Sequence, residues 1–307
     1  MSEMKLSVVI VNWNTCKLLE KCLVSVFSNP PDQEFEVWIV DNASTDQSVP
    51  MVRETFPRVN LIINDTNLGF SGANNQAIRR CKGEYVLLLN LDTEVRSNAL
   101  DFLIDTMENH PEVGGAGAKI LNPDGTLQIS CYPEPTLSRE LWRLFQLDRV
   151  RHYGSYDFVA WNPDHSREVD VIQGACLILR TRALEEVGLL DEDYFMYTEE
   201  VDLCFRLRKA HWRLVWVPQA NVVHYGGQAT QQVATEMFLE LYRSKILYFY
   251  KHHGWLSASL YKLIVFAATL ARLIVSPFAL FEEQRACDKH LSLASNYRRL
   301  LSELFSM

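Results

Sequence analysis

Four short apolar segments in the first hundred residues constrain the fold of this chain more than any other feature. They are rich in β-branched residues and cover 6–12, 35–42, 60–65 and 84–92. Between them lie helix-length stretches whose apolar residues recur every three or four positions. Continuous apolar strands that alternate with amphipathic helices are typical of a parallel sheet covered on both faces. Because such crossovers are right-handed, we predict a Rossmann-like α/β fold with an open, mostly parallel sheet.

Each of these apolar segments ends at polar residues, and this placement predicts where a ligand binds. The polar ends carry Asn12, Asp41 and Asn42, Asn64 and Asp65, and Asn90 and Asp92. In open α/β sheets, ligands bind beyond the carboxyl ends of the strands. A single polar strand end is more often a turn residue or a helix cap. Four of them on one edge favour a ligand site.

The sequence argues against several common classes of nucleotide or nucleic-acid binding. It lacks the G-x-x-x-x-G-K-[ST] pattern of P-loop proteins, and the turn after the first predicted strand, NWNTCK (12–17), contains no glycine. A Rossmann dinucleotide site needs glycines there so that the backbone can approach the pyrophosphate. The formal net charge of −8 argues against a nucleic-acid partner, which would require a basic face.

The cysteines and the N-terminus predict a cytoplasmic protein. The seven cysteines are scattered and form no C-x-x-C pair. This suits reduced thiols better than a disulfide framework or a zinc site. The first apolar segment is too short, and the N-terminus too acidic, for a secretory signal.

Asp92 is a candidate metal ligand on the residues alone. It lies in LNLDT (89–93), at the end of an apolar strand whose tip should reach the predicted ligand site. A carboxylate there can bind a divalent cation that neutralises a diphosphate. The alternative is a cap for the helix that follows it, and the residues alone leave both interpretations open.

Several motifs occur in a specific order over roughly residues 5–230. They are VVIVNWN (8–14), VDNASTD (40–46), NLGFSGANNQAI (67–78), LLLNLDT (87–93) and the long segment 174–227. This ordered set resembles the family-two, inverting glycosyltransferases with the GT-A fold. It is most similar to the branch that contains rhamnosyltransferases and galactofuranosyltransferases of bacterial surface polysaccharides.

The resemblance implies a nucleotide site in the first half of the chain. The residues that it places around the nucleotide are Val11, Asn12, Asp41, Asn67, Gly69, Asn75 and Asn90. Asp41 would bond the edge of the base, and Asn67 and Gly69 would shape a loop over the nucleotide that Asn75 supports. Asn74 stands where many relatives carry Arg or Lys.

The resemblance also implies a metal site for Mg²⁺ or Mn²⁺. The D-x-D motif of the family is Asn90-Leu91-Asp92 in this chain, so its first acid is missing. Asp92 would carry the metal, with Asn90 only as an indirect partner. His224, in VVHYGG (222–227), matches a histidine that supplies a further metal ligand in relatives. Without the resemblance, a lone histidine is more often a packed or a surface residue.

The acidic segment DEDYFMYTEEVDLCFR (191–206) is the candidate for the catalytic base. An acidic first turn of a helix would explain part of its charge, whereas inverting transfer needs one base to take the proton of the acceptor hydroxyl. The resemblance favours Glu200, with Glu199 as the rival. Asp202 is expected to orient the segment or to pair with Arg206, four residues on. Aromatic side chains that could either line the site or pack in the core are Tyr194, Phe195, Tyr197 and Trp216.

The most apolar segment lies near the C-terminus, in KLIVFAATLARLIVSPFALFEE (262–283). Its length is near that needed to span hydrocarbon, but the central Arg272 and Pro277 disfavour spanning. Basic residues nearby favour a helix that lies against anionic lipid. We expect peripheral membrane contact through 257–283, with intramolecular packing as the main alternative and spanning as the least favoured one.

These inferences predict a metal-dependent, inverting hexosyltransferase. It would move a sugar such as rhamnose from a nucleoside-diphosphate donor to a saccharide or lipid-linked acceptor in cell-surface polysaccharide synthesis. The catalytic domain is predicted over 1–230, with a nucleotide-binding half (1–110) and an acceptor half (111–230), followed by a helical segment (231–307). The alternatives are a nucleotidyltransferase and a catalytically degenerate, sugar-binding relative.

Overall fold

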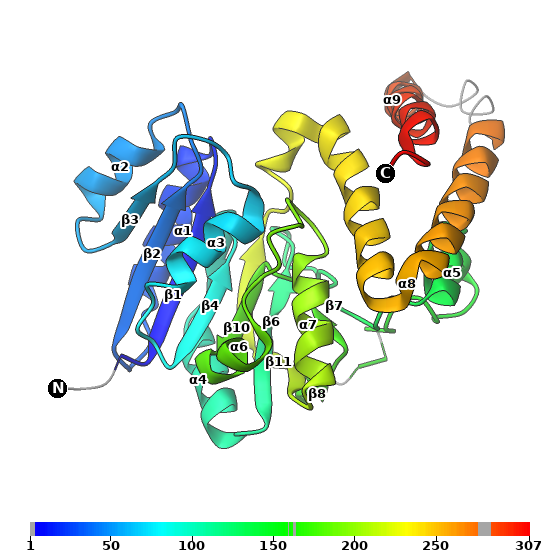
Figure 1. Ribbon diagram of the computed structural model, residues 1–307. Helices are drawn as coiled ribbons and strands as arrows, with labels where there is room; N and C mark the ends of the chain where they lie inside the picture. The colour runs from blue at the N-terminus through cyan, green and yellow to red at the C-terminus, as the bar shows by residue number, and fades with distance from the viewer. Residues whose placement is uncertain (1–3, 159, 162–163, 276–283) are drawn as a thin grey trace. The chain divides into compact units, whose positions relative to one another are not determined.

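The computed structural model describes residues 4–158, 160–161, 164–275 and 284–307 (Figure 1). Pro277 and the end of the apolar segment that surrounds it lie outside these residues. The chain divides into two compact units. The first consists of residues 1–134 and 157–232, and the second of residues 135–156 and 233–307.

A large mixed sheet forms the centre of the first unit. Its strands follow the order β3-β2-β1-β4-β10-β6-β11-β5. Their bounds are β1 Leu6–Asn12, β2 Phe35–Asp41, β3 Asn60–Ile63, β4 Tyr85–Leu89, β5 Thr93–Val95, β6 Val113–Leu121, β10 Cys176–Arg180 and β11 Arg213–His224. The short strand β8 (Arg167–Glu168) pairs with β11, and β7 (Cys131–Tyr132) pairs with β9 (Val171–Ile172) in a separate small sheet.

Most strands of this sheet run in one direction, as predicted. β1 is parallel to β2 and β4, and β2 is parallel to β3. β10 is antiparallel to both β4 and β6, so β6 runs parallel to β4, and β11 runs parallel to β6. The carboxyl ends of β1, β2, β4 and β11 therefore share one edge, where Asn12, Asp41 and His224 are the terminal residues.

The apolar runs WRLVWVP (212–218) and NVVHYGG (221–227), each of which predicts a separate strand, join in a single strand, β11. Its pairing with β6 continues from Val217 with Ala118 directly to Asn221 with Lys119, so residues 218–220 bulge out of the ladder. Pro218 begins this bulge, and proline cannot donate a ladder hydrogen bond. The proline at 218 indicated the end of a strand, but in the structure the strand continues past a bulge at this point.

Helices cover the sheet of the first unit on both faces. They are α1 (Cys16–Ser28), α2 (Ser48–Thr55), α3 (Gly69–Ile78), α4 (Ala99–Asn109), α6 (Thr181–Val187) and α7 (Glu199–Lys209). The crossover through α1 leads away from β4 and that through α3 leads towards it, so right-handed connections place these helices on opposite faces. In Figure 1, α3 lies in front of the sheet and α1 behind it. The buried face of α1 packs in the same core as Leu6, Val8 and Ile10 of β1.

The second unit is helical and holds a buried ion-pair cluster. It contains α5 (Leu137–Leu144), α8 (Ala234–Val275) and α9 (Gln284–Glu303). Glu140 is 1% exposed and accepts from Lys245 at 2.7 Å and from Arg143 at 3.2 Å. Burial raises the pKa of Glu140, but the two cations outweigh it and hold that pKa below its usual value. Gly254, with a φ of 80°, bends α8 into two limbs.

Helix α3 is tied at two points to the chain that precedes α7. The amide of Phe70 donates to the carbonyl of Phe195 at 2.7 Å, and the side chain of Asn75 donates to the carbonyl of Leu190 at 2.8 Å. Gly69 lies where α3 and the chain before α7 approach each other most closely. A Cβ there would stand 2.3 Å from the carbonyl oxygen of Phe195. Its φ of 74° is also left-handed. Glycine is therefore required at this position for two separate reasons.

We predict that Gly69→Ala destabilises the protein and loosens this contact. The left-handed backbone alone should cost about 1–2 kcal/mol of unfolding free energy, and the clash with Phe195 adds to it. Hydrogen exchange at the Phe70 amide should accelerate, because the contact that protects this amide is weakened. Thermal unfolding and amide hydrogen exchange measure the two effects.

Gly72→Ala in the same helix is the matched control. A Cβ at Gly72 would contact only the Cβ of Leu68, at 3.4 Å. Since alanine is favoured over glycine in a helix by about 0.5–1 kcal/mol, this variant should be neutral or stabilised. Equal stability and equal Phe70 exchange in the two variants would contradict the role given to Gly69.

Candidate functional site

Polar side chains at the ends of β1 and β2 form one hydrogen-bonded group. Asn12 and Asp41 are partners in the strand register, and Asn12 Nδ2 donates to Asp41 Oδ2 at 2.9 Å. The other Asp41 oxygen accepts from the Ser44 amide at 2.9 Å. Val11, one residue before Asn12, is half-buried and pairs with Val40 of β2. Three of the residues predicted near the nucleotide therefore lie together at this edge.

Asn42 organises the loop that follows β3, a role that the sequence analysis missed. It is buried, and its Nδ2 donates to Asn67 Oδ1 at 2.8 Å and to the Gly69 carbonyl at 3.1 Å. Its Oδ1 accepts from Asn64 Nδ2 at 3.1 Å and from the Leu68 amide at 3.0 Å. The polar strand end drew attention to this position, but nothing local to it indicated bonds to residues more than twenty positions away.

The side chains of Asn75 and Asn74 are both used inside the protein. Asn75 is buried and bonds both the carbonyl and the amide of Leu190, and it donates to Glu192 at 2.9 Å. Asn74 donates to the carbonyl of Phe70 at 2.9 Å. Asn75, in the second half of α3, thus ties this helix to the chain before α7, and the structure gives its amide no contact with Asn67.

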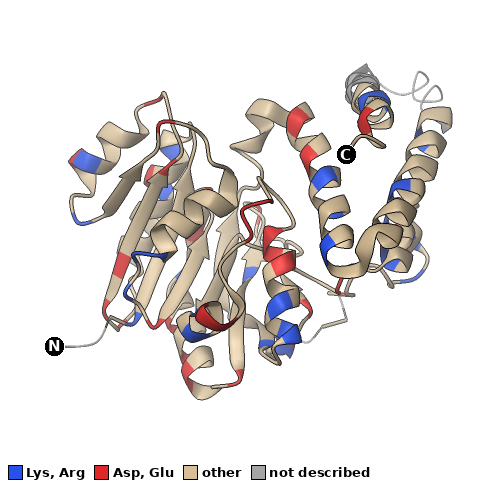
Figure 2. Ribbon diagram, in the orientation of Figure 1, with Lys and Arg blue, Asp and Glu red and all other residues tan. Residues whose placement is uncertain are grey.

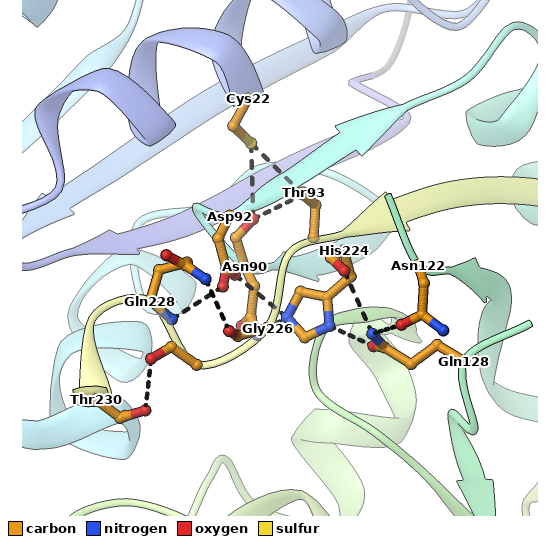
Figure 3. Close-up of polar contacts among 11 residues, drawn as sticks. Cys22, Asn90, Asp92, Thr93, Asn122, Gln128, His224, Gly226, Gln228 and Thr230 are labelled. Atoms are coloured by element: carbon orange, nitrogen blue, oxygen red, sulfur yellow. Dashed lines mark hydrogen bonds and ion pairs between the residues drawn. The ribbon is translucent and has the colours of Figure 1, made fainter. Parts of the chain in front are cut away.

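Asp92 and His224 face each other at the same edge of the sheet (Figure 3). Asp92 Oδ1 and His224 Nε2 are 3.2 Å apart, with the side chains 7% and 5% exposed. Asn90 Nδ2 lies 3.4 Å from the same imidazole nitrogen. The chain after His224 curls over Asp92, where the Gln228 amide donates to Asp92 Oδ2 at 3.4 Å. The three residues that the resemblance linked to a metal are therefore adjacent.

Gln128 sets the orientation of the His224 ring. Gln128 Nε2 donates to Asn122 Oδ1 at 2.8 Å and to the His224 carbonyl at 3.3 Å. Its Oε1, which can only accept, lies 2.6 Å from His224 Nδ1. Nδ1 therefore carries a proton, and Nε2 faces Asp92 Oδ1. Two lone-pair atoms at 3.2 Å repel each other unless a proton or a cation lies between them.

This donor set fits a divalent cation that is bound jointly with a substrate. A carboxylate oxygen and an imidazole nitrogen are suitable ligands for such ions. No group of three or more His, Cys, Asp or Glu side chains that could hold a metal occurs among the residues that the structure describes. Because Mg²⁺ is commonly bound by one or two protein groups together with substrate phosphates, two ligands suffice for a site that the donor completes.

The acidic residues predicted to include the base begin α7. Figure 2 shows acidic residues at its N-terminal end and basic ones at its C-terminal end. Glu199 is buried and Glu200 is half-buried. Asp202 pairs with Arg206 at 2.7 Å, which confirms the predicted i, i+4 contact. Part of the negative charge in this segment therefore stabilises α7 through this ion pair.

Strained backbone precedes Glu200 and connects it to the loop after β11. Tyr197 and Thr198 have φ values of 66° and 70°, which are uncommon for residues other than glycine. The Tyr197 hydroxyl bonds the side chain of Thr230, which follows the residues that curl over Asp92. Burial raises the pKa of Tyr197, and the carboxylates of Glu199 and Glu200 raise it further. These contacts bring the start of α7 to the loop that covers the Asp92–His224 pair.

The aromatic candidates divide between the core and the surface. Tyr194 and Trp216 are each 1% exposed, and Trp216 packs edge-on against Phe158 and Trp161. Phe195, in contrast, is 38% exposed beside Gly69. Of these four aromatic side chains, only Phe195 and the half-buried Tyr197 have a surface that is accessible from solvent.

Two family models match the chain. The model for glycosyl transferase family 2 matches residues 7–159, and the model for glycosyl transferase family group 2 matches residues 85–281. Together they cover both the strand ends and the segment with Glu200 and His224.

Two relatives and one solved structure are similar over most of the chain. The N-acetylglucosaminyl-diphospho-decaprenol L-rhamnosyltransferase of Mycobacterium tuberculosis is 30% identical over 83% of this chain and 87% of its own length. The low-salt glycan biosynthesis hexosyltransferase Agl10 of Haloferax volcanii is 27% identical over 77% of this chain and 72% of its own. The mannosyltransferase PcManGT of Pyrobaculum calidifontis, solved in complex with GDP-Man and Mn²⁺, gives a TM-score of 0.57 at 17% identity, over 99% of this chain and 87% of its own.

The structural likeness concerns the fold, which is GT-A-like, as the motif order predicted. The sequence matches extend over the strand ends, the Asp92–His224 pair and α7 alike. On this evidence the chain belongs to glycosyl transferase family 2.

Proposed function

We propose that this glycosyltransferase transfers a hexose, with inversion, from a nucleoside-diphosphate donor to a saccharide or lipid-linked acceptor. The observation that carries the proposal is the pair formed by Asp92 and His224. Asp92 Oδ1 and His224 Nε2 lie 3.2 Å apart at the edge where strands of the sheet end. A cation-binding pair at that edge suits a diphosphate donor.

In this proposal the donor binds along the ends of β1 and β2. Asp41 has both oxygens held by Asn12 and Ser44, so its carboxylate is fixed in place to accept from the base. The turn at Asn67 and Gly69, which Asn42 holds, would lie over the nucleotide. In this proposal Asn75 supports the turn indirectly, because it holds α3 against the chain before α7.

Asp92 and His224 are proposed to hold Mg²⁺ or Mn²⁺ with the donor. When bound, the ion would stabilise the negative charge that develops on the leaving nucleoside diphosphate. Asn90, beside the imidazole, would orient His224 rather than bind the ion. The Mn²⁺ in the complex of the Pyrobaculum mannosyltransferase supports this choice of ion.

Glu200 is proposed as the general base. Direct displacement needs one group that takes the proton of the acceptor hydroxyl as it attacks the anomeric carbon. Glu200 is half-buried at the start of α7, whereas Glu199 is 5% exposed and Asp202 is engaged by Arg206. Of the three carboxylates in this turn, Glu200 is the least buried.

The relatives support a role in cell-surface polysaccharide synthesis. The Mycobacterium relative is named for a rhamnosyl transfer to a decaprenol-linked sugar, and the Haloferax relative for glycan biosynthesis. We propose rhamnose or a related sugar as the transferred group and a lipid-linked saccharide as the acceptor. Such a reaction would take place in the cytoplasm, at the cytoplasmic face of the membrane.

Family membership favours sugar transfer over the nucleotidyltransferase alternative. The remaining alternative is a degenerate relative that binds a sugar without reaction, because the first acid of D-x-D is Asn90. Assays of a panel of UDP-, dTDP- and GDP-sugars with Mn²⁺ separate the three. Release of nucleoside diphosphate supports transfer, pyrophosphate supports nucleotidyl chemistry, and binding without release supports the degenerate relative.

We predict that Glu200→Gln lowers the transfer rate by about 10²–10⁴, the usual contribution of general base catalysis. The thermal shift produced by the donor should be unchanged, because the base acts on the acceptor. Initial rates of nucleoside-diphosphate release, measured with the donor identified in the panel, test this. Glu199→Gln is the comparison, and if it alone abolishes transfer, the base is Glu199.

Asp92→Asn and His224→Ala should each remove the Mn²⁺-dependent part of the stabilisation by UDP, dTDP or GDP. Ligand stabilisation follows RT ln(1 + [L]/Kd), so a tenfold weaker complex loses about 1.4 kcal/mol at high ligand concentration. Differential scanning fluorimetry with Mn²⁺ and with excess chelator measures this part. Asp65→Asn changes an exposed acid at another strand end and should behave as the parent protein. Retention of the Mn²⁺ effect in both variants of the pair would exclude them as ligands.

A further inference from the structure

The second limb of α8 exposes an unusual amount of apolar surface. One helix among the described residues, Thr230–Ile274, is long and apolar enough to cross a membrane by length and composition, and only 28% of its most apolar stretch is buried. The large apolar side chains exposed on the limb after Gly254 are Trp255, Leu256, Leu260, Leu263, Phe266, Leu270 and Ile274. Their exposed fractions range from 37% to 71%. A core helix would bury these side chains, so this limb presents a surface for a partner.

Six exposed apolar positions form one continuous stripe along the helix. Positions 256, 260, 263, 267, 270 and 274 follow each other at steps of four, three, four, three and four, and all are exposed and apolar. Such spacing places the side chains on a single face. The limb from 255 to 275 is about 30 Å long at 1.5 Å per residue. We call this face the apolar stripe.

The opposite face of the limb is polar at several points and packs within the second unit. Tyr261 is fully buried and lies next to the carboxylate of Glu140, and its burial and this carboxylate both raise the pKa of its hydroxyl. Arg272 donates to the Leu144 carbonyl and lies over the ring of Tyr297 at 5.3 Å. A spanning helix would carry these contacts into hydrocarbon. An in-plane helix keeps them on the water side while its apolar stripe enters the lipid.

The charges on α8 distinguish a lipid surface from a second copy of the chain. Between residues 241 and 275 there are five basic residues and no acidic one, and Figure 2 shows no acidic residue on the second limb. Steps of three and four also occur in coiled coils, but these flank their seam with charges of both signs. The second limb itself carries Lys262 and Arg272 and no acidic residue, so it offers no charge of opposite sign to a second copy, whereas an anionic bilayer complements its basic charge.

We propose that the apolar stripe is an in-plane binding surface for an anionic lipid bilayer. Trp255 and Leu256 would enter the interface at the end next to the bend, and Ile274 at the other end. Lys262, at the side of the stripe, would place its stem along the lipid and its charge among the headgroups. This surface is independent of the proposed chemistry, because vesicle binding requires no sugar donor.

Flotation of the full chain with vesicles tests the proposal. The parent protein should float with vesicles of phosphatidylglycerol and phosphatidylethanolamine, and less with phosphatidylcholine alone. Leu263→Glu with Leu270→Glu should lower the partition coefficient about tenfold or more, since both side chains would leave the lipid. Val24→Glu with Phe102→Glu is the matched control, because both positions are exposed and apolar on helices of the first unit. It should bind as the parent does.

Three results would overturn the proposal. The first is the absence of flotation with either lipid, and the second is equal binding by the stripe variant and the parent. The third is a dimer in solution that the stripe variant converts to a monomer while vesicle binding stays unchanged, which assigns the stripe to a second copy. Release by alkaline carbonate is expected for an in-plane helix, and resistance to it would favour spanning.

A separate observation concerns Gln128, which we propose as a positioning residue for His224. Its amide is oriented by Asn122, which itself is fixed by a bond from its Nδ2 to Thr126 at 2.9 Å. The acceptor oxygen of Gln128 then holds the proton on His224 Nδ1 at 2.6 Å. Groups that orient metal-bound histidines in this way commonly affect metal affinity 10–100-fold. This inference rests on the proposed metal site.

Electron paramagnetic resonance of Mn²⁺, titrated with the nucleoside diphosphate that stabilises the protein, tests this role without any measure of activity. Gln128→Ala should weaken Mn²⁺ binding about 10–100-fold, while Gln128→Glu, which keeps the acceptor for Nδ1 but loses the donor to Asn122 and to the His224 carbonyl, should weaken it less. Thermal unfolding checks that both variants fold. If His224→Ala loses Mn²⁺ but Gln128→Ala does not, the positioning role is wrong and the metal site stands. If His224→Ala also retains Mn²⁺, both proposals fail.

Discussion

The parallel pairing of β11 with β6 is the constraint on which the site depends. It makes β11 end at the same edge of the sheet as β1, β2 and β4, although more than one hundred residues separate it from them. An antiparallel β11 would place His224 at the opposite edge, about 30 Å or more away for a strand of its length. The direction of one strand therefore decides whether Asp92 has a partner.

Local patterns in the sequence were sufficient to predict the sheet and its edge. Apolar strands that end in Asn12, Asp41 and Asp92 indicated the ligand side, and the spacing of Asp202 and Arg206 indicated a helical pair that the structure contains. His224 was different, because no residue near it in the chain suggested a partner. Only the order of the motifs connected it to Asp92.

The features that the sequence analysis missed all depend on contacts between distant segments. Asn42 holds a loop more than twenty residues further on, and Gln128 bonds an imidazole 96 residues away. A hydrogen bond of this kind leaves no periodic pattern, because each partner is a single polar residue in an irregular segment. The continuity of β11 was also missed, since Pro218 is a turn signal in sequence but only begins a bulge in the sheet.

The bonds of Asn75 link the two segments to which we assign the donor and the acceptor. One amide side chain holds Leu190 from both sides, and Phe70 and Phe195 are joined by their backbones. The turn assigned to the donor and the approach to α7 therefore share one mechanical support. Motion of the turn at Asn67 and Gly69 is therefore resisted by the same contacts that hold the chain before Glu200. A donor that orders the turn at Asn67 and Gly69 would in this way also order the chain before Glu200, before an acceptor binds.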